Sequence, residues 1–363
     1  MVTGGKRIFY VLIEYPQLSQ TYVANEIAAL RADGHQVFVA ALNQPDTYYD
    51  TDVPYEITKD FDRTIALIRE FRPDVLHGHW LYTVPLLEKL SRKMGIPYTV
   101  RAHSFDITQT GPKAPAWKTA LRRARMLMQY RDTRPPDMAF VLGPYLKGDH
   151  CLGVLTFPYG RQKFLEAGVA EEKVHDCFPV MDFARFHDET PNGEDVMNVG
   201  ACTPKKKMED FVDLAVMVPE RHFRLYPVGF QAPRILEYNR EHGSPVEFAG
   251  VIPQKDMARE YKRHQWLVYT AEHNLHGDHV GWSVAVAEAQ ASGVGVCFPN
   301  MRPDLKQYVG EGSGYLYNRI EEIAEIVRNP VPEDVRRKGF EQAKKSDIRI
   351  HKKILTDIWD KVA

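Results

Sequence analysis

Short apolar runs alternate with helical patterns along most of the chain. The near-continuous apolar run over 7–13 is typical of a strand buried on both faces of a parallel sheet. Apolar positions then recur at helical spacing, and Gly34 follows where that helix should end. Ser19 can cap this helix, with Thr21 as the alternative cap. Because a second apolar run covers 36–42, the chain is predicted to open with a right-handed β-α-β unit.

The same alternation continues through the first half of the chain. Apolar runs predict further strands over 73–80, 98–102, 151–156 and 173–178. Helical spacing predicts helices over 60–71, 84–94, 116–130 and 162–167. Together these elements predict a first α/β domain over 1–180.

The alternation restarts after a polar stretch over 181–194, which is interpreted as a linker. Strands are predicted over 196–200, 223–228, 246–248, 266–269, 294–298 and 314–317. Helices are predicted over 209–218, 257–263, 283–291, 320–327 and 335–345. They predict a second α/β domain over 195–345. A closing helix within 346–363 can cross back to the first domain.

Composition narrows the class of protein. The chain has 363 residues and a net charge of -1, which gives no global sign of a nucleic-acid binder. Its four cysteines are widely spaced without a CxxC pair, so reduced core residues of a cytosolic protein are expected. No apolar run is long enough for a transmembrane helix, and no signal peptide is predicted. Peripheral docking on a membrane surface stays open.

The segment over 276–293 carries the strongest candidate for ligand binding. A predicted strand precedes it, Gly281 allows a loop, and a helix rich in Ala and Val follows. A strand, a loop and a helix N-terminus together form an anion site, because free N–H groups and the helix dipole converge there. Glu288 lies inside this helix and needs a partner if it is buried. That partner is either a ribose diol or a neighbouring loop.

Two loops at carboxyl ends of predicted strands add candidates, since open α/β sheets bind ligands there. Lys205, Lys206 and Lys207 follow the strand over 196–200 and form either a phosphate grip or a solvated surface. His103 and Asp106 follow the strand over 98–102 and are either site residues or structural ones.

Three other patterns have both a functional and a purely structural interpretation. His77 and His79 share a face of a strand but lack a third metal ligand, so the wall of a cleft is favoured. Asp60 and Asp62 spell DxD, which holds a metal in some glycosyltransferases, yet a helix start is favoured. The basic helix over 116–130 faces either an anionic partner, such as lipid, or solvent.

The order and spacing of several motifs resemble those of retaining glycosyltransferases of family 4. The segment PQLSQTY (16–22), followed by Asn25-Glu26, is similar to the PxLSETF opening of polysaccharide-assembly members. Matching landmarks recur over nearly the whole chain, at 77–80, 101–106, 178–182, Phe186, 199–200, Gly250 and 288–293. The resemblance implies the GT-B fold, in which two Rossmann-like doubly wound domains face an inter-domain cleft.

The resemblance also implies roles by position. His103 would lie beside the transferred sugar, with Asp106 as the second catalytic candidate. The residues expected to bind the donor are Lys205, Lys206, Val251, Gly281, Trp282, Ser283 and Glu288. The residues expected on the acceptor side are Ser19, Gln20, Thr21 and His79. Such enzymes retain the anomeric configuration and need no metal or cofactor beyond the nucleotide-sugar co-substrate.

Two positions depart from the family pattern. Ala201 stands where the family has an arginine, and Lys205 or Lys207 is the expected replacement as a phosphate clamp. Val280 stands where the family has the first of two glutamates. Polar residues that can substitute for that glutamate lie just before it, namely Glu272, His273, His276, Asp278 and His279.

The leading hypothesis is a cytoplasmic enzyme that moves a hexose from a nucleotide-diphosphate donor to a hydroxyl of a glycan or lipid-linked acceptor. Peripheral contact with the inner membrane face accompanies it. One rival is an inactive GT-B subunit that binds glycan or a partner protein. A second rival is a glycosyltransferase acting on nucleic acid or protein, motivated by the arginines within 122–134.

Overall fold

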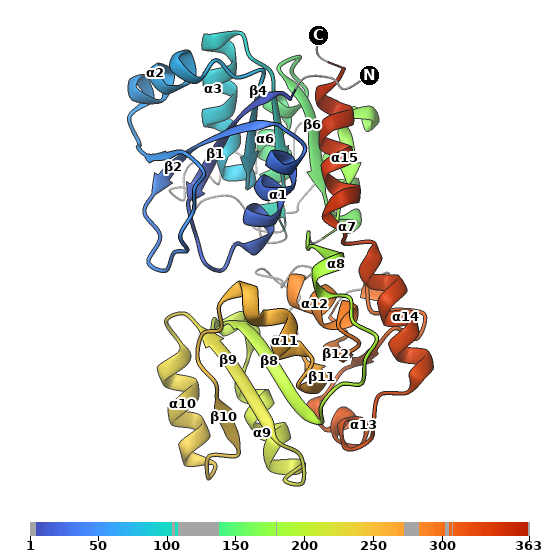
Figure 1. The fold of residues 1–363 in the computed structure, drawn as a ribbon. Coiled ribbons are helices and arrows are strands. Elements are labelled where there is room, and N and C mark those ends of the chain that lie inside the picture. The colour runs from blue at the N-terminus through green and yellow to red at the C-terminus, as the bar shows by residue number, and fades with distance from the viewer. Residues whose placement is uncertain are drawn as a thin grey trace, which may run out of the picture. The chain divides into compact units, whose positions relative to one another are not determined.

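The computed structural model describes residues 5–103, 106–107, 138–178, 180–271, 283–301, 305–306 and 308–361. The chain divides into two compact units. Unit 1 comprises residues 1–178 and 351–363, and unit 2 comprises residues 179–350. Each unit is built around its own parallel sheet, so the predicted pair of Rossmann-like α/β domains is confirmed (Figure 1).

Unit 1 contains a seven-stranded sheet in the order β3-β2-β1-β4-β5-β6-β7. Its strands are β1 (Arg7–Glu14), β2 (Gln36–Asn43), β3 (Tyr55–Ile57), β4 (Val75–His79), β5 (Tyr98–Arg101), β6 (Cys151–Thr156) and β7 (Val174–Asp176). All neighbours pair in parallel. The sequence pattern does not predict β3, because this short edge strand has no fully buried residue and therefore no apolar run.

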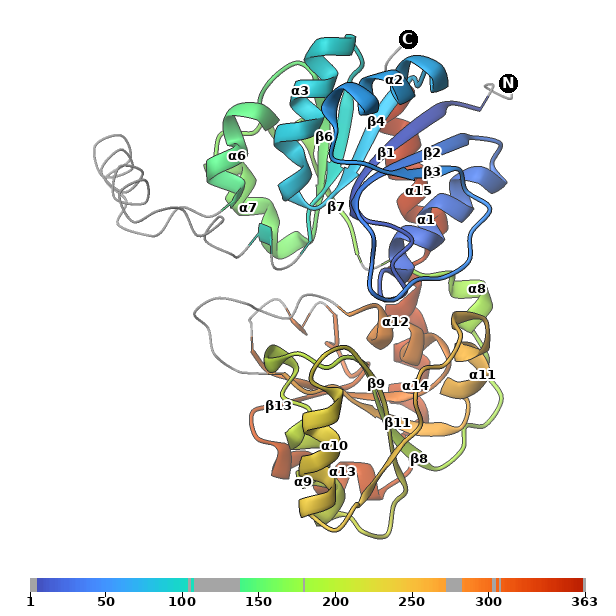
Figure 2. The ribbon, with the colours of Figure 1, turned by 90° about the vertical axis from the view of Figure 1, so that its left-hand side faces the viewer.

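Helices cover both faces of this sheet. They are α1 (Thr21–Ala32), α2 (Phe61–Phe71), α3 (Val84–Met94), α6 (Met138–Leu146), α7 (Pro158–Glu166) and α15 (Ile348–Trp359). Figure 2 shows α1 and α15 on one face and α3 and α6 on the other. The DxD pattern belongs to the start of α2, because the Asp60 carboxylate accepts from the backbone N–H groups of Asp62 and Arg63 at 2.8 and 3.2 Å.

The C-terminal helix α15 completes the core of unit 1. Leu355, Ile358 and Trp359 are buried against the apolar residues of α1, β1 and β2. The indole Nε1 of Trp359 donates to the hydroxyl of Thr99 on β5 at 3.0 Å. The last turn of α15 is thus held in place both by apolar packing and by a buried hydrogen bond.

Unit 2 contains a six-stranded sheet in the order β10-β9-β8-β11-β12-β13. Its strands are β8 (Asp195–Ala201), β9 (Phe223–Val228), β10 (Val246–Phe248), β11 (His264–Val268), β12 (Gly295–Pro299) and β13 (Tyr315–Tyr317). Its helices are α8 (Phe183–Phe186), α9 (Glu209–Met217), α10 (Ala232–Glu241), α11 (Met257–Tyr261), α12 (Val284–Ala291), α13 (Ala324–Arg328) and α14 (Glu333–Lys344).

Two helices of unit 2 depart from the sequence prediction. The short helix α8 lies inside the predicted linker, where Phe183 and Phe186 are buried. Helix α10 is absent from the prediction because it buries only Ile235 and Asn239, which is too narrow an apolar stripe to recognise.

The strand orders place a topological switch in each unit. In unit 1 the chain leaves β1 on one side to β2 and returns on the other to β4, and in unit 2 β9 and β11 flank β8 in the same way. Ligands of open α/β sheets bind at the carboxyl ends of strands beside such a switch. The predicted site loops follow β5, β8 and β11, at this edge of their sheets.

Two further expectations concern the core and the membrane. The four cysteines are buried free thiols, as expected of core residues. Across the part of the chain that the structure describes, no helix is both long enough and apolar enough to span a bilayer.

The packing of α15 predicts that Trp359→Ala destabilises unit 1. Removing a buried tryptophan leaves a cavity, so the free energy of unfolding should fall by about 3–5 kcal/mol. Denaturant unfolding followed by circular dichroism measures the change. The control is Lys353→Ala on the same helix, whose exposed ion pair with Asp357 should contribute less than about 1 kcal/mol. Equal stability of the two variants would contradict the packing described here.

Candidate functional site

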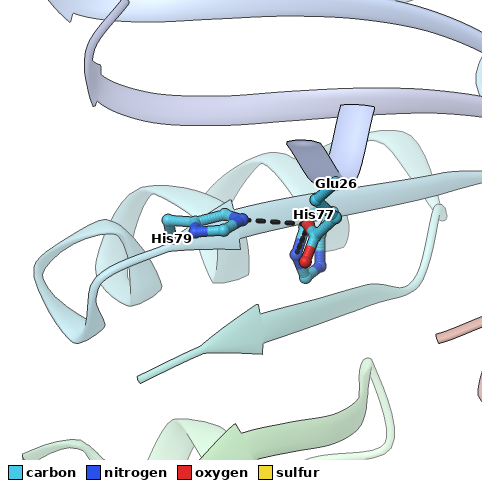
Figure 3. Close-up of side chains that lie close together, drawn as sticks. All are labelled: Glu26, His77 and His79. Atoms are coloured by element: carbon cyan, nitrogen blue, oxygen red, sulfur yellow. Dashed lines mark hydrogen bonds and ion pairs between the residues drawn. The ribbon is translucent and has the colours of Figure 1, made fainter. Parts of the chain in front are cut away.

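A buried polar cluster lies at the carboxyl end of β4 in unit 1. His77 and His79 are two residues apart on this strand, so both side chains lie on one face, as predicted. Both imidazoles reach the carboxylate of Glu26, which α1 supplies (Figure 3). His79 Nε2 lies 3.0 Å and His77 Nε2 3.3 Å from Glu26 Oε1. All three side chains are fully buried.

Arg101 and Tyr10 complete the surroundings of the Glu26 carboxylate. The Nε atom of Arg101, the last residue of β5, lies 3.3 Å from Oε2, and the Tyr10 hydroxyl donates to Oε1 at 2.9 Å. Burial alone would raise the pKa of Glu26, but the Arg101 charge and the His79 and His77 contacts outweigh it and hold that pKa well below its usual range. Glu26 is therefore ionised at neutral pH.

Glu26 also completes a set of three groups that could in geometry surround a metal ion, which the histidine pair alone could not. One ligand atom each from Glu26, His77 and His79 lie within 4.8 Å of one another. However, the Arg101 guanidinium already compensates the carboxylate. A divalent ion would add two uncompensated positive charges to a buried site, at a large desolvation cost. The geometry therefore favours a hydrogen-bonded network over a metal centre.

His103 joins this network from the loop after β5. Its Nε2 lies 3.1 Å from His79 Nδ1, and its ring packs against those of Trp80 and Tyr22 with centroids 3.9 and 4.8 Å apart. Burial, followed by the effects of His79 and Arg101, lowers the pKa of His103 well below its usual value. His103 is thus a neutral imidazole at physiological pH.

Asp106 holds the same loop in place. Its Oδ1 accepts from the backbone N–H of His103 at 2.7 Å, and its Oδ2 from that of Leu81 at 2.5 Å. Burial raises the pKa of Asp106 to about 8, against the lowering effect of these backbone donors. Since both oxygens bind main chain, Asp106 positions His103 relative to the turn after β4. The predicted catalytic role of Asp106 could then only be indirect, through the position of the loop that carries His103.

The acceptor-side candidates divide into exposed and buried residues. Ser19 is exposed, and Gln20 and Thr21 at the start of α1 are partly exposed. The capping prediction is wrong: Gln20 is the N-cap residue, and no side chain caps the helix. The Ser19 hydroxyl instead accepts from Gln17 Nε2 at 3.2 Å. His79 is fully buried, so it can act on an acceptor only through His103.

In unit 2, Lys206 is the lysine of the predicted phosphate grip that turns toward the sheet. It ends the short 3-10 turn Pro204–Lys206 after β8, donates to the Tyr269 hydroxyl, and lies 3.7 Å above that ring. Burial and the neighbouring Lys205 charge lower the pKa of Lys206 to about 7. Lys207 forms an ion pair with Asp210 at 3.1 Å, so its charge is already compensated.

A row of aromatic rings connects Lys206 with the N-terminus of α12. Tyr269 stacks on Phe298 with ring centroids 4.6 Å apart, and Phe298 contacts Tyr308 edge-on at 6.1 Å. The Tyr308 hydroxyl donates to the backbone oxygen of Ser283, the N-cap residue of α12. The lysine and the helix tip therefore belong to one packed assembly at the carboxyl edge of the sheet.

Glu288 has protein partners on both carboxylate oxygens. Gln254 Nε2 donates to Oε1 at 3.2 Å, and the Tyr261 hydroxyl donates to Oε2 at 3.0 Å. Burial raises the pKa of Glu288, against the lowering effect of these two bonds. The structure thus shows the alternative in which neighbouring protein groups satisfy this glutamate. A carboxylate has about four acceptor positions, so two bonds leave capacity for a ribose hydroxyl.

The remaining donor candidates are less defined. Val251 is 56% exposed and follows β10 after Gly250, whose φ of +73° favours glycine. Ala201 ends β8 opposite Val228. Other predicted residues lie outside the described part of the chain, and these are Gly281, Trp282, Val280, the polar residues from Glu272 to His279, and the basic helix over 116–130.

Sequence reasoning missed the central roles of Glu26, Arg101 and Tyr269. Glu26 had one usable signal, because it lies on the apolar face of α1 beside Val23 and Ile27. A carboxylate at such a position requires a buried partner. Arg101 and Tyr269 carry no comparable local signal, since their partners come from distant parts of the chain.

Part of the chain matches a known sequence family. Residues 19–134 match the sequence family described as a glycosyl transferase 4-like domain. No curated protein sequence matches the chain significantly.

Solved structures address the fold. HepE of Anabaena in complex with UDP and glucose shares 12% identity, with a TM-score of 0.72 over 98% of this chain and 100% of its own. Sucrose-phosphate synthase of Thermosynechococcus elongatus shares 14% identity, with a TM-score of 0.70 over 98% and 99%. The lipopolysaccharide outer core galactosyltransferase WaaB shares 12% identity, with a TM-score of 0.62 over 97% and 98%. The chain thus has the GT-B fold, and residues 19–134 match a glycosyl transferase 4-like domain, in agreement with the resemblance of its motifs.

Proposed function

We propose that this protein transfers a hexose from a nucleotide-diphosphate sugar to a hydroxyl of a glycan or lipid-linked acceptor, with retention of anomeric configuration. The observation that carries the proposal is the assembly of Lys206, Tyr269 and the α12 N-terminus at the carboxyl edge of the unit 2 sheet. Two comparisons support it. HepE has been solved with UDP-glucose, and WaaB is described as a lipopolysaccharide galactosyltransferase.

The assembly suits a diphosphate leaving group. Negative charge grows on the diphosphate as the bond to the sugar breaks, and fixed positive groups aimed at it lower the barrier. Lys206 supplies a cation, and the first turn of α12 supplies N–H groups and the positive end of its dipole. The cation is held by a tyrosine hydroxyl and ring rather than by a carboxylate, so an anionic ligand need not displace an existing ion pair.

Other candidates follow from this placement of the diphosphate. Glu288 lies further along α12, where it would hold the ribose hydroxyls beside its bonds to Gln254 and Tyr261. Val251 would meet the base through its backbone. For unit 1, the family resemblance and not the site in unit 2 implies that His103 would contact the transferred sugar and the acceptor, with Ser19, Gln20 and Thr21 on the acceptor side.

The rival with specific support is an inactive subunit that binds glycan or a partner. Ala201 supports it, because the family's arginine at this position would add a second phosphate clamp. Lys205 and Lys207 are the replacements that this chain offers, and Lys207 is paired with Asp210. Donor binding and turnover distinguish the two functions.

Donor binding should depend on Lys206 and Glu288. Lys206→Met removes a charge-assisted contact and should weaken UDP-glucose binding by about 10- to 100-fold, and Glu288→Gln by about tenfold. Calorimetry over a panel of nucleotide sugars measures both. Lys344→Met and Glu333→Gln on the exposed side of α14 are matched controls that should bind like the wild type. A folded wild type that binds no nucleotide sugar would refute the proposed function.

Donor affinity should also fall as pH rises. With a pKa of about 7, Lys206 is charged below pH 7 and loses its proton above it. A bound diphosphate favours the charged form, so binding above pH 7 takes up a proton. The dissociation constant should then rise by up to roughly tenfold per pH unit between pH 7 and 9. Lys206→Arg, which stays charged, should show a flat profile. A pH-independent wild type would show that Lys206 does not meet the diphosphate.

The product should retain the donor's anomeric configuration, and the reaction should survive metal removal. Lys206 and the α12 N-terminus supply positive charge that a metal would otherwise provide. Proton NMR of the glycosidic coupling in the first-formed product reports the configuration. Activity after treatment with EDTA reports the metal requirement. An inverted product, or activity restored only by added Mg²⁺ or Mn²⁺, would contradict this part of the proposal.

A further inference from the structure

A directed chain of hydrogen bonds runs from Glu26 to His103 through His79. Glu26 Oε1 lies 3.0 Å from His79 Nε2, and His79 Nδ1 lies 3.1 Å from His103 Nε2. Glu26 and His79 are fully buried, and His103 is only 7% exposed. The three residues come from α1, β4 and the loop after β5, so the chain links three elements of unit 1.

We propose that Glu26 sets the tautomer of His103 through His79, so that His103 carries its proton on Nε2 and leaves Nδ1 as a hydrogen-bond acceptor. An ionised carboxylate only accepts, so His79 must donate from Nε2. A neutral imidazole has a single N–H, so His79 Nδ1 must then accept from His103 Nε2–H. His103 Nδ1 is left without a proton.

The protonation states of the cluster are consistent with this direction of the hydrogen bonds. Burial, the largest effect, lowers the pKa of His79 to about 4, and it lowers that of His103 as well. Both rings are therefore neutral at pH 7, whereas Glu26 beside Arg101 is ionised. Among the described residues, the other ionisable groups beside the network are Tyr10, Tyr22, His77, Asp106, which bonds the backbone of His103, and the buried thiol of Cys177. Burial raises the pKa of both tyrosines, so they are neutral too.

His77 and Arg101 fix the direction of the chain. Thr99 Oγ1 accepts from Trp359 Nε1 at 3.0 Å, so its hydroxyl proton can be donated to His77 Nδ1 at 2.7 Å. His77 then carries its proton on Nε2, which lies 3.3 Å from Glu26 Oε1 without forming a hydrogen bond, where a lone pair would be repelled. Tyr10 and His79 form the hydrogen bonds to Oε1, and the Arg101 guanidinium lies 3.3 Å from Oε2 as an ion-pair partner.

The consequence for catalysis rests on the proposed function. A hydroxyl that attacks the sugar gives up its proton as its oxygen bonds to the sugar carbon, so it benefits from an acceptor for that proton, such as His103 Nδ1. The opposite tautomer would present an N–H there and would withdraw electron density from that oxygen. Glu26 and His79 are thus positioning residues that determine which ring nitrogen of His103 can accept a hydrogen bond from a hydroxyl.

Glu26→Gln tests the inference, because an amide reverses the chain. Its oxygen should face the Arg101 guanidinium, which leaves the NH₂ group toward His79. His79 would then accept at Nε2 and donate from Nδ1, and His103 would carry its proton on Nδ1. Two-bond proton–nitrogen correlation spectra of ¹⁵N-histidine-labelled protein distinguish the tautomers, and His103→Ala identifies the signals. We expect the Nε2–H form in the wild type and the Nδ1–H form in the variant.

Tyr10→Phe is the matched control. It removes one buried hydrogen bond to Glu26 Oε1 but reverses none, so the Nε2–H form of His103 should remain. With an active donor and acceptor pair, Glu26→Gln should lower kcat by about 10- to 100-fold while donor binding is unchanged. A purely structural role would lower thermal stability in both variants alike and would leave the tautomer as it is.

Three results would overturn the inference: a wild-type His103 protonated on Nδ1, an unchanged tautomer in Glu26→Gln, or one equivalent of metal in the purified protein that His79→Ala releases. The spectra need no substrate, so they also separate the two proposals. Expected tautomers without transfer from any nucleotide sugar would reject the proposed function and leave the role of Glu26 standing. Transfer activity together with a His103 protonated on Nδ1 would support the proposed function and reject the role of Glu26.

Discussion

The burial of one carboxylate constrains most of unit 1. Glu26 has no exposed surface, and an ionised group in such a place requires both a counter-charge and hydrogen-bond donors. Arg101 supplies the charge, Tyr10 and His79 supply hydrogen-bond donors, and His77 lies 3.3 Å away, so α1, β1, β4 and β5 must all meet at one point. A one-residue slip of β4 would turn both histidines to the other face of the sheet. The register of β4 in the sheet therefore decides whether the polar cluster around Glu26 can form.

In unit 2 the charged side chains of the site have uncharged hydrogen-bond partners. The positive charge of Lys206 rests on a tyrosine hydroxyl and ring, and burial together with Lys205 lowers its pKa to about 7. Glu288 is bonded to neutral groups, and burial raises its pKa. In unit 1 the charges of Glu26 and Arg101 cancel within the protein, whereas among the described residues Lys206 forms no ion pair and Glu288 is only influenced by the charge of Arg185 without an ion pair. A ligand that brings both an anion and hydroxyl donors would satisfy both groups. This contrast supports unit 2 as the side that binds a nucleotide sugar.

The sequence predicted what depends on local pattern and missed what depends on distant partners. Apolar runs identified the long strands, and the loops after β5, β8 and β11 were found because parallel strands end at a common edge. The strand β3 and helix α10 bury too few residues to produce a pattern. The histidine pair was recognised, but its third partner lies on a helix far away in the chain. Serine is a common N-cap residue, which predicts a cap at Ser19, yet the Ser19 hydroxyl accepts a hydrogen bond from Gln17 instead.

The C-terminal helix extends the same network in the other direction. Trp359 donates to Thr99, Thr99 can then donate to His77 Nδ1, and the other ring nitrogen of His77 lies 3.3 Å from Glu26. The orientation of each bond depends on the one before it, since a hydroxyl that accepted from two neighbours would leave its own proton unused. A residue four positions from the end of the chain therefore influences the same carboxylate that orients His103. Packing of α15 and polarity of the cluster are coupled through a single threonine, which explains why an indole, with its one fixed donor, suits this position better than a purely apolar ring.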